Sequence, residues 1–187
     1  AHLHSDLIVG LPREDEESFA RGFDALHAAG PHEIQVGILK RLRGTPLAER
    51  ADAWGLRFSP RAPYEILASD ALSFAQLQRL RRFARVWELV ANSGRFEQGK
   101  ALLVGDGSAY GAFAALSDWL FTKLGGVAAI ALSRWLTLLF DYLRGPRGLD
   151  PGLVAHTLLA DYLAGGHNDV PPELRPYLPP GLDLRAL

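Results

Sequence analysis

Residues 5–39, SDLIVGLPREDEESFARGFDALHAAGPHEIQVGIL, contain two short apolar segments on either side of an amphipathic one, and this pattern indicates the fold class. The first apolar segment, residues 5–10, is partly β-branched and is followed by a Leu-Pro pair, which predicts a buried strand. In the second segment, residues 33–39, apolar residues alternate with others, and Ile34 and Val36 share one face. This alternation predicts a second strand.

Between these strands the sequence predicts a helix over residues 14–29. Four consecutive acidic residues lie in its first turn, where they suit the positive end of the helix dipole. Phe19, Phe23 and Leu26 recur with helical spacing and form one buried stripe, and Gly30 ends the helix. A strand, a helix and a strand joined by short links are typical of a parallel βαβ unit.

A second βα unit consists of the strand at 33–39, a basic turn, and a short helix predicted over 47–54. Two such units cannot cover both faces of a parallel sheet, so we expect further strands to flank them in an intact protein. The chain contains no Met and begins inside what we interpret as a strand. We therefore expect it to be part of a longer polypeptide, whose N-terminal remainder is its partner.

Helical patterns dominate after residue 60. Ser73 and Gln76 predict a capping box at the start of a long amphipathic helix. The helices predicted in this part are 73–91, 108–124, 127–143 and 151–164, followed by an irregular, Pro-rich tail. We therefore predict a mixed, predominantly α fold, with a domain of two βα units over 1–60 and a helical domain over 61–187.

The composition excludes several classes of protein. With 20 basic and 21 acidic residues the net charge is −1, which argues against a strongly basic nucleic-acid binder, and we expect no nucleic-acid partner. The absence of Cys excludes disulfides, thiol nucleophiles and thiolate-bound metals within this chain. The longest apolar stretch, 125–140, is shorter than the ~18 residues of a membrane span and contains Arg134. Since no leader is visible either, we expect a cytoplasmic protein without a membrane partner.

His2, His4 and Asp6 project from one face of the first predicted strand. Imidazole and carboxylate ligands on a strand are what a zinc- or iron-dependent hydrolase requires, so a hydrolase that uses these three residues is one hypothesis. Such sites draw further ligands from later strands. The other four His residues lie in predicted helices or loops, so we expect no tightly bound iron or zinc in the chain itself.

Two other polar clusters have ordinary interpretations. The Gly-rich stretch 105–111 has the spacing of neither a dinucleotide fingerprint nor a phosphate-binding loop, and it predicts a loop followed by a helix N-cap. A group of four Arg on the long helix predicts a solvated face; its members are Arg79, Arg81, Arg82 and Arg85. The four Trp lie at apolar helical positions typical of a core.

Two segments resemble a known superfamily. Residues 6–12, DLIVGLP, followed by Glu14, resemble the fifth-strand motif of radical SAM enzymes, commonly written D-L-I-x-G-L-P-G-E. Residues 39–46, LKRLRGTP, are similar to the sixth-strand segment of the same enzymes. The resemblance covers residues 1–58, and it departs from the motif at Arg13, where the family has Gly. That departure puts the geometry of this turn in question, since Gly permits turns that Arg adopts less readily.

The helical remainder is similar to the C-terminal domain of unknown function in cobalamin-binding radical SAM proteins. This similarity rests on residues 64–67, YEIL, and 80–83, LRRF.

The resemblance implies an incomplete, TIM-like (β/α)6 barrel. In such enzymes a [4Fe–4S] cluster, held by three Cys after the first strand, cleaves S-adenosylmethionine (SAM) to a 5′-deoxyadenosyl radical. It further implies that Asp6 contacts the ribose or methionine part of SAM, while Ile8 and Leu39 line the adenine site. Gly10, on the same predicted strand face as Asp6, completes this set. The parent protein would then hold the cluster and SAM, together with cobalamin if it belongs to the cobalamin-binding members.

The sequence thus favours the C-terminal part of a radical SAM Fe–S enzyme of oxidoreductase type. This part contributes some of the SAM site and a helical accessory domain, and we expect it to be inert alone because it lacks the cluster ligands. Neither the substrate nor the reaction of the parent is specified by these residues. Two alternatives stay open: a helical binding or interaction module, and the metal-dependent hydrolase.

Overall fold

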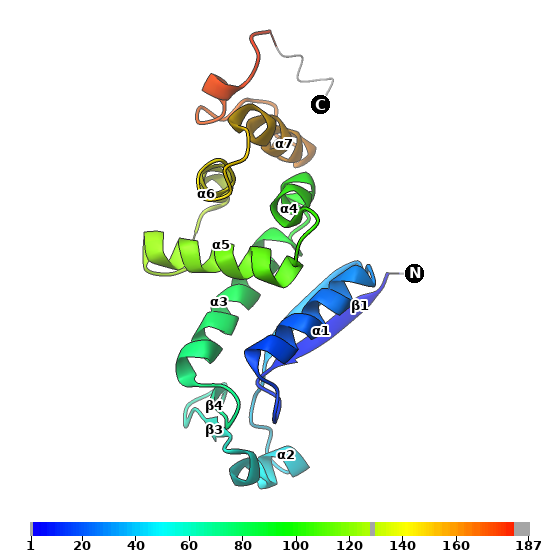
Figure 1. Cartoon of the computed structure of the whole chain (residues 1–187), viewed down its shortest axis with the longest axis vertical. Helices are drawn as coiled ribbons and strands as arrows, with labels where there is room; N and C mark the ends of the chain where they lie inside the picture. Colours follow the sequence, from blue (N-terminus) through cyan, green and yellow to red (C-terminus); the bar gives the residue numbers. More distant parts are fainter. Residues whose placement is uncertain (1, 128–129, 182–187) are drawn as a thin grey trace.

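The computed structural model describes residues 2–127 and 130–181, and this part of the chain is mainly helical (Figure 1). Its elements, in chain order, are β1 (His4–Val9), α1 (Glu16–Ala28), β2 (Glu33–Ile38), α2 (Pro46–Glu49), β3 (Arg57–Phe58), β4 (Ile66–Ala68), α3 (Phe74–Val90), α4 (Glu97–Val104), α5 (Ala109–Leu124), α6 (Leu132–Arg144) and α7 (Pro151–Ala164). Short 3-10 turns lie at Ala51–Trp54 and Arg175–Tyr177. The predicted mixed, predominantly α composition is confirmed.

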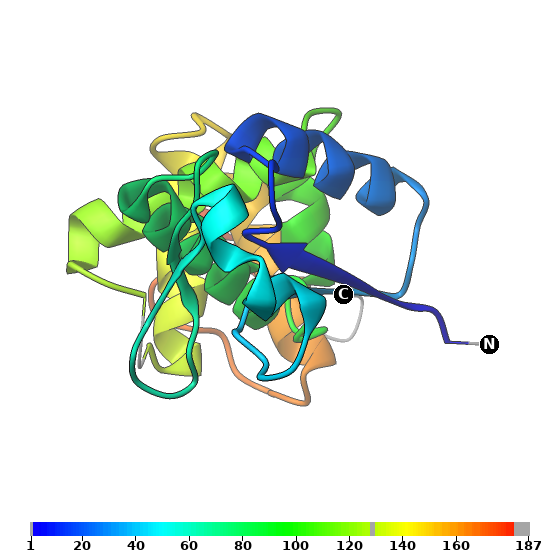
Figure 2. The same cartoon turned by 90° about the horizontal axis from the view of Figure 1, so that it is seen from below.

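β1 and β2 form a two-stranded parallel sheet, as the sequence predicts, with Leu7 opposite Val36 and Val9 opposite Ile38. α1 connects the two strands and lies alongside β1 (Figure 2). Within the described residues no further strand joins this sheet. The incomplete barrel that the resemblance implies is therefore not formed by these residues alone, and it stays a prediction about a longer protein.

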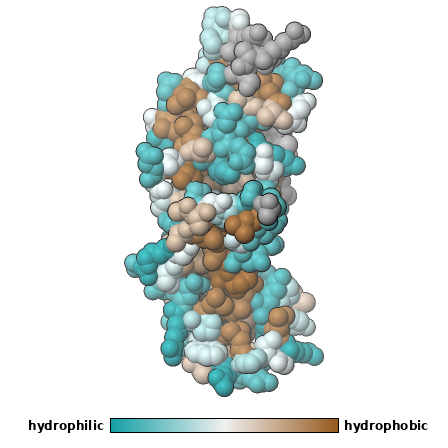
Figure 3. Space-filling view, turned by 90° about the vertical axis from the view of Figure 1, so that its right-hand side faces the viewer, coloured by the Kyte–Doolittle hydropathy of each residue, from teal (hydrophilic) through white to brown (hydrophobic). Residues whose placement is uncertain are grey.

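The two faces of this sheet differ. On one face Val9 and Ile34 are buried against the helices, with Leu7 partly buried beside them. On the other face His4, Asp6 and Ile8 are exposed. Figure 3 shows the molecule from the right-hand side of Figure 1, where β1 lies. Apolar side chains gather in the lower half of this view. A parallel sheet with one uncovered face is unusual, because such sheets are normally covered on both faces.

α1 begins two residues later than predicted, because Asp15 is its N-cap. The Asp15 carboxylate accepts a 2.7 Å hydrogen bond from the backbone N–H of Ser18. The Ser18 hydroxyl in turn accepts a 3.1 Å bond from the Asp15 N–H, which completes a capping box. Phe19 and Phe23 are buried, as the predicted apolar stripe requires.

The antiparallel pair β3–β4 was not predicted. Strands of two and three residues are too short to show a periodic pattern. The end of β2 is joined to this pair, because the carbonyl of Leu39 accepts a 2.9 Å hydrogen bond from the N–H of Ile66. The predicted helix over 47–54 is divided into α2 and the 3-10 turn that follows it.

The helical part contains one helix that the sequence analysis missed. α4 has no capping side chain of its own: the carboxylate of Asp161, on α7, accepts hydrogen bonds from the N–H groups of Gln98 and Gly99 at 3.0 and 2.8 Å. Gly99 also packs closely on α7, where a Cβ would lie 2.8 Å from Leu158. α4 therefore depends on a distant partner, and no local signal marks it.

The other helices lie close to their predicted ranges. α3 begins with the predicted capping box, in which the Gln76 N–H donates to the Ser73 hydroxyl and the Gln76 side chain accepts from the Ser73 N–H. α5 and α7 match their predicted ranges within one residue. α6 begins at Leu132 rather than Val127, and part of the range between them lies outside the described residues. Of the predicted irregular tail, residues 182–187 also lie outside them.

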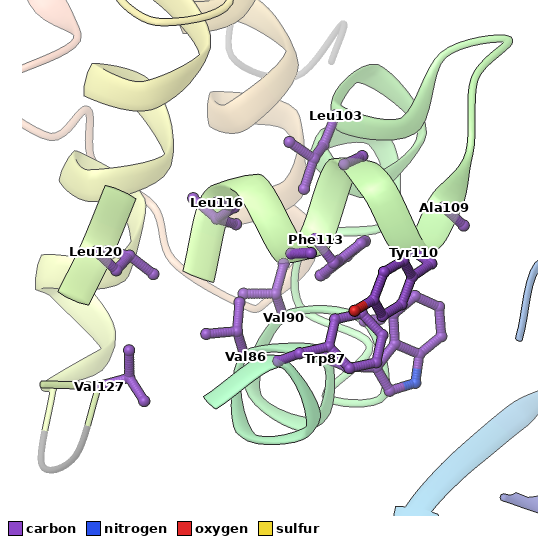
Figure 4. Close-up of a cluster of buried hydrophobic side chains, with 14 of the residues drawn as sticks. Val86, Trp87, Val90, Leu103, Ala109, Tyr110, Phe113, Leu116, Leu120 and Val127 are labelled. Atoms are coloured by element: carbon purple, nitrogen blue, oxygen red, sulfur yellow. The ribbon is translucent and has the colours of Figure 1, made fainter. Parts of the chain in front are cut away.

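One continuous buried cluster extends through these elements. Figure 4 shows its centre, where Trp87 of α3 and Phe113 of α5 pack with Leu103 of α4. The same cluster includes Phe23 of α1, whose ring centroid lies 4.8 Å from that of Trp87. The Trp87 Nε1–H also donates a buried 2.8 Å hydrogen bond to the carbonyl of Ile34 in β2. Residues before and after position 60 thus share a core, and the division at residue 60 stays a prediction.

Within the described residues, no helix combines the length and the apolar character that crossing a membrane requires.

Candidate functional site

The exposed face of β1 and β2 is the candidate site, and we call it the open sheet face. The parallel register places three residues of β1 beside three of β2 on this face; the pairs are His4 and Glu33, Asp6 and Gln35, and Ile8 and Gly37. Because side chains alternate along a strand, every second residue faces the same way, which puts polar and apolar groups together here.

Two of the predicted SAM-site residues lie on the open sheet face. Asp6 is exposed, and within the described residues no hydrogen bond or ion pair occupies its carboxylate. Ile8 is 37% exposed and lies over Gly37, where a Cβ would come 3.1 Å from the Ile8 Cδ1. Glycine at position 37 thus leaves room for the Ile8 side chain. The face presents a free carboxylate next to an apolar surface.

The other two predicted site residues, Gly10 and Leu39, do not lie on the open sheet face. The prediction that Gly10 shares a strand face with Asp6 is wrong. This residue follows the end of β1 with a φ of +92° and is buried. A Cβ at Gly10 would lie 2.8 Å from Ile66 Cγ2, so the residue faces β4 and not the open sheet face. Leu39 is half-buried, packs against the core, and is hydrogen-bonded to Ile66 through its carbonyl. Both residues lie where the carboxyl ends of β1 and β2 contact β4.

The turn after β1 keeps a glycine-like geometry without a glycine. Arg13, which stands where the motif that residues 6–12 resemble has Gly, has a φ of +66°. This left-handed conformation is readily adopted by Gly and costs other residues about 1–2 kcal/mol. The tight turn is therefore retained at the expense of backbone strain.

Glu14 follows this turn and is partly buried. Its Oε2 atom is buried and has no hydrogen-bond partner among the described residues. Burial, and to a lesser degree the neighbouring Asp15 carboxylate, raise the pKa of Glu14. The segment that follows the carboxyl end of β1 thus carries a partly buried carboxyl group, and one of its oxygens has no hydrogen-bond partner among the described residues.

At the opposite end of the open sheet face, two imidazoles and one carboxylate converge. One ligand atom from each of His2, His4 and Glu33 lies within 4.8 Å of the other two. His4 Nδ1 is 3.0 Å from Glu33 Oε2. Asp6, which the sequence analysis grouped with the two His, is not a member of this group. Glu33 was missed because it lies on the other strand, and only the parallel register places it beside His4.

The solvated face predicted for the four Arg of α3 is observed only in part. Arg79 is 2.8 Å from both Glu16 and Asp118. Arg82 stacks over the Phe121 ring at 4.1 Å, and Arg81 pairs with Glu65. The expectation is wrong for Arg79 and Arg82, because carboxylates from α1 and α5 and the Phe121 ring approach them in the folded chain, whereas Arg81 and Arg85 are exposed, as predicted.

The described residues form several cavities away from the sheet. One, of about 480 Å³, adjoins the loop after β2 and is lined by Arg41, Arg43 and Tyr64 among others. Another, of about 280 Å³, lies in the helical part beside Phe96 and Asp161. Burial raises the pKa of Asp161 although two backbone N–H groups oppose the shift. Because its oxygens accept hydrogen bonds from α4, this buried carboxylate has a structural role.

The chain is similar to part of a curated protein and matches a protein family. The chain is 39% identical over 66 residues to the cobalamin-dependent radical SAM methyltransferase TokK of Streptomyces tokunonensis. This match covers 34% of the chain and 10% of the methyltransferase, so it concerns a small part of that protein. Residues 52–176, more than half of the chain, match the family described as "Protein of unknown function (DUF4080)". The chain therefore belongs to the DUF4080 family, and its similarity to part of a radical SAM enzyme supports a radical SAM-related region.

Proposed function

We propose that this chain is the C-terminal part of a cobalamin-dependent radical SAM enzyme. In this proposal β1 and β2, connected by α1, are the last two strands of an incomplete barrel, and α3 to α7 form an accessory domain. The observation that carries it is the open sheet face, because a parallel sheet buried on one side only is normally covered on the other by the rest of a fold. The similarity to TokK supports the same reading.

The two faces of the sheet fit the two sides of a barrel wall. In a (β/α) barrel the helices cover the outside of the strands, and functional groups lie toward the carboxyl ends of the strands. Here the helices pack on the face that carries Val9 and Ile34, so the open sheet face corresponds to the barrel interior. The N-terminal remainder of the same polypeptide would supply the missing strands and act as the partner of this chain.

The residues present fit part of a SAM site. Asp6 offers an unpaired carboxylate that can accept hydrogen bonds from ribose hydroxyls, and Ile8 offers an apolar surface for an adenine ring. When bound, SAM supplies the group-transfer and radical chemistry of the enzyme. The chain has no Cys, so the ligands of a [4Fe–4S] cluster would lie in the N-terminal remainder. We therefore expect the chain alone to be inert, and a cytoplasmic location belongs to the same proposal.

Asp6→Asn in the full-length polypeptide tests the proposal. Removing the carboxylate while keeping its size should weaken SAM binding by roughly 10- to 100-fold, since a hydrogen bond to a charged group contributes about 1.5–3 kcal/mol. The affinity is measured by titration of the reconstituted enzyme, and 5′-deoxyadenosine formation is measured in parallel. Asp106→Asn, an exposed carboxylate in the loop before α5, is the matched control and should change neither quantity.

Two results would overturn the proposal. One is a full-length polypeptide that lacks a cluster-binding Cys motif upstream of Ala1 and does not bind SAM. The other is an Asp6→Asn enzyme with unchanged SAM affinity and lowered thermal stability, which would make Asp6 the structural partner of a barrel cation. The first result would favour the helical interaction module.

A further inference from the structure

The geometry points to a divalent metal site formed by His2, His4 and Glu33 at the amino-terminal edge of the open sheet face. The site would bind a transition-metal ion of the zinc class through two imidazole nitrogens and one carboxylate oxygen. This donor set suits Zn²⁺, which binds imidazole and carboxylate in tetrahedral geometry. The assignment is independent of the proposed function.

The distances are close to those that an ion requires. Tetrahedral Zn²⁺ with ligand bonds of ~2.0–2.2 Å places two ligand atoms ~3.3–3.5 Å apart. His4 Nδ1 and Glu33 Oε2 are already 3.0 Å apart, and all three ligand atoms lie within 4.8 Å of one another. Both His side chains are exposed, so their rotamers are free to adjust to an ion.

The elements hold the ligands in place. His4 and Glu33 are the first residues of β1 and β2 and are opposite each other in the parallel register. The backbone N–H of Leu3 donates a 3.0 Å hydrogen bond to His32 Nδ1, which fixes the segment that carries His2 next to the start of β2. The ring of His2 lies 4.6 Å from that of His4. An ion here would join the starts of the two strands.

The location indicates a structural ion. The carboxyl ends of the strands, where barrel sites lie, are at the other end of the sheet, near Leu39. Three protein ligands leave one tetrahedral position open to water, which structural zinc sites usually fill with a fourth protein ligand, so the location and not the ligand number carries this assignment. The ion would stabilise the pairing of β1 and β2, because it binds the folded register and the ligands are far apart in the unfolded chain.

Zinc titration of the 187-residue chain tests the inference. The protein, freed of any affinity tag and treated with a chelator, is titrated with Zn²⁺ in a calorimeter, and its melting temperature is followed with and without the metal. We expect one Zn²⁺ per chain and a higher melting temperature. His4→Ala and Glu33→Gln should each weaken binding roughly 10- to 100-fold or more, as the loss of supporting groups does in other metal sites.

Two controls separate this site from the alternatives. His156→Ala removes an exposed imidazole of α7 and should leave zinc affinity unchanged. Asp6→Asn distinguishes the site seen in the structure from the His2, His4 and Asp6 set suggested by the sequence, and it should also leave zinc affinity unchanged. Equal affinity in the wild type, His4→Ala and Glu33→Gln would overturn the inference, as would a stoichiometry well below one. Circular dichroism of the metal-free variants verifies that they fold.

Discussion

The phenolic hydroxyl of Tyr110, on α5, donates a 2.9 Å hydrogen bond to Oε1 of Glu16 in the first turn of α1. The same oxygen accepts a 2.8 Å bond from Arg79 of α3, and Arg79 also bonds to Asp118. Nearby, the carboxylate of Asp24 accepts a 2.8 Å hydrogen bond from the backbone N–H of Tyr110. These polar contacts join α1 to α3 and α5, and they add to the apolar core that these helices share.

Tyr110→Phe should lower the free energy of unfolding by about 1.5–3 kcal/mol, because it removes a hydrogen bond to a charged group in a largely buried position. Chemical denaturation at pH 7 measures the change. Tyr64→Phe removes a hydroxyl from an exposed side chain and serves as the control. Equal losses in the two variants would show that the contact with Glu16 contributes nothing specific.

The pair of Tyr110 and Glu16 also predicts that the stability of the folded chain depends on pH in the alkaline range. Burial, followed by the hydrogen bond to Glu16, raises the pKa of Tyr110 above its usual value of 10.0. Above pH 10 the unfolded chain therefore releases a proton that the folded chain retains, so the stability that Tyr110 contributes falls as the pH rises further. The difference in unfolding free energy between the wild type and Tyr110→Phe should shrink above pH 10. A difference independent of pH between 8 and 11 would contradict this expectation.

Arg13→Gly should stabilise the chain by about 0.5–1 kcal/mol. The φ of +66° at this position strains any residue with a Cβ, and the relief exceeds the entropy that Gly adds to the unfolded chain. Arg13→Ala keeps the strain and removes only the exposed side chain, so it should show no comparable gain. Thermal and chemical denaturation of both variants decide the point, and a stabilised Ala variant would assign the effect to the arginine side chain.

The stability of the Glu14→Gln variant, relative to that of the wild type, should increase as the pH rises. Because the pKa of Glu14 is raised above its usual 4.5, the folded wild type retains a proton that the unfolded chain loses, and wild-type stability declines between the two pKa values. The unfolding free energies of the two proteins are compared from pH 4 to pH 7. The exposed Glu173→Gln is the control. A constant difference between Glu14→Gln and the wild type over this range would exclude the buried charge as the cause.

Gly10→Ala should cost about 2 kcal/mol or more, through its positive φ and the 2.8 Å approach of the new Cβ to Ile66 Cγ2. Part of this cost should disappear when Gly10→Ala is introduced into an Ile66→Ala background, where the clash is absent. A double-mutant cycle in unfolding free energy measures the coupling. Strictly additive losses would show that backbone strain alone accounts for the glycine.

Some features of this protein follow from residues close together in the chain. The spacing of Phe19 and Phe23 predicts α1, the alternation around Ile34 predicts β2, and short links through a helix predict that the strands are parallel. Period-two alternation also correctly places Asp6 and Ile8 together on one face. These properties are local because helical and extended backbones repeat every few residues, so that hydrophobic spacing alone reports them.

Other features depend on contacts between distant residues and could not be read from the sequence. Glu33 joins His2 and His4 only through the strand register, α4 is capped by Asp161, which follows Gly99 by 62 residues, and Gly10 faces Ile66 of β4. Hydrophobic spacing along the chain is enough to predict the type of each long element and the composition of each face. Which polar groups and glycines meet depends on the tertiary structure, because these pairings require the whole chain to be folded before the partners come within bonding distance.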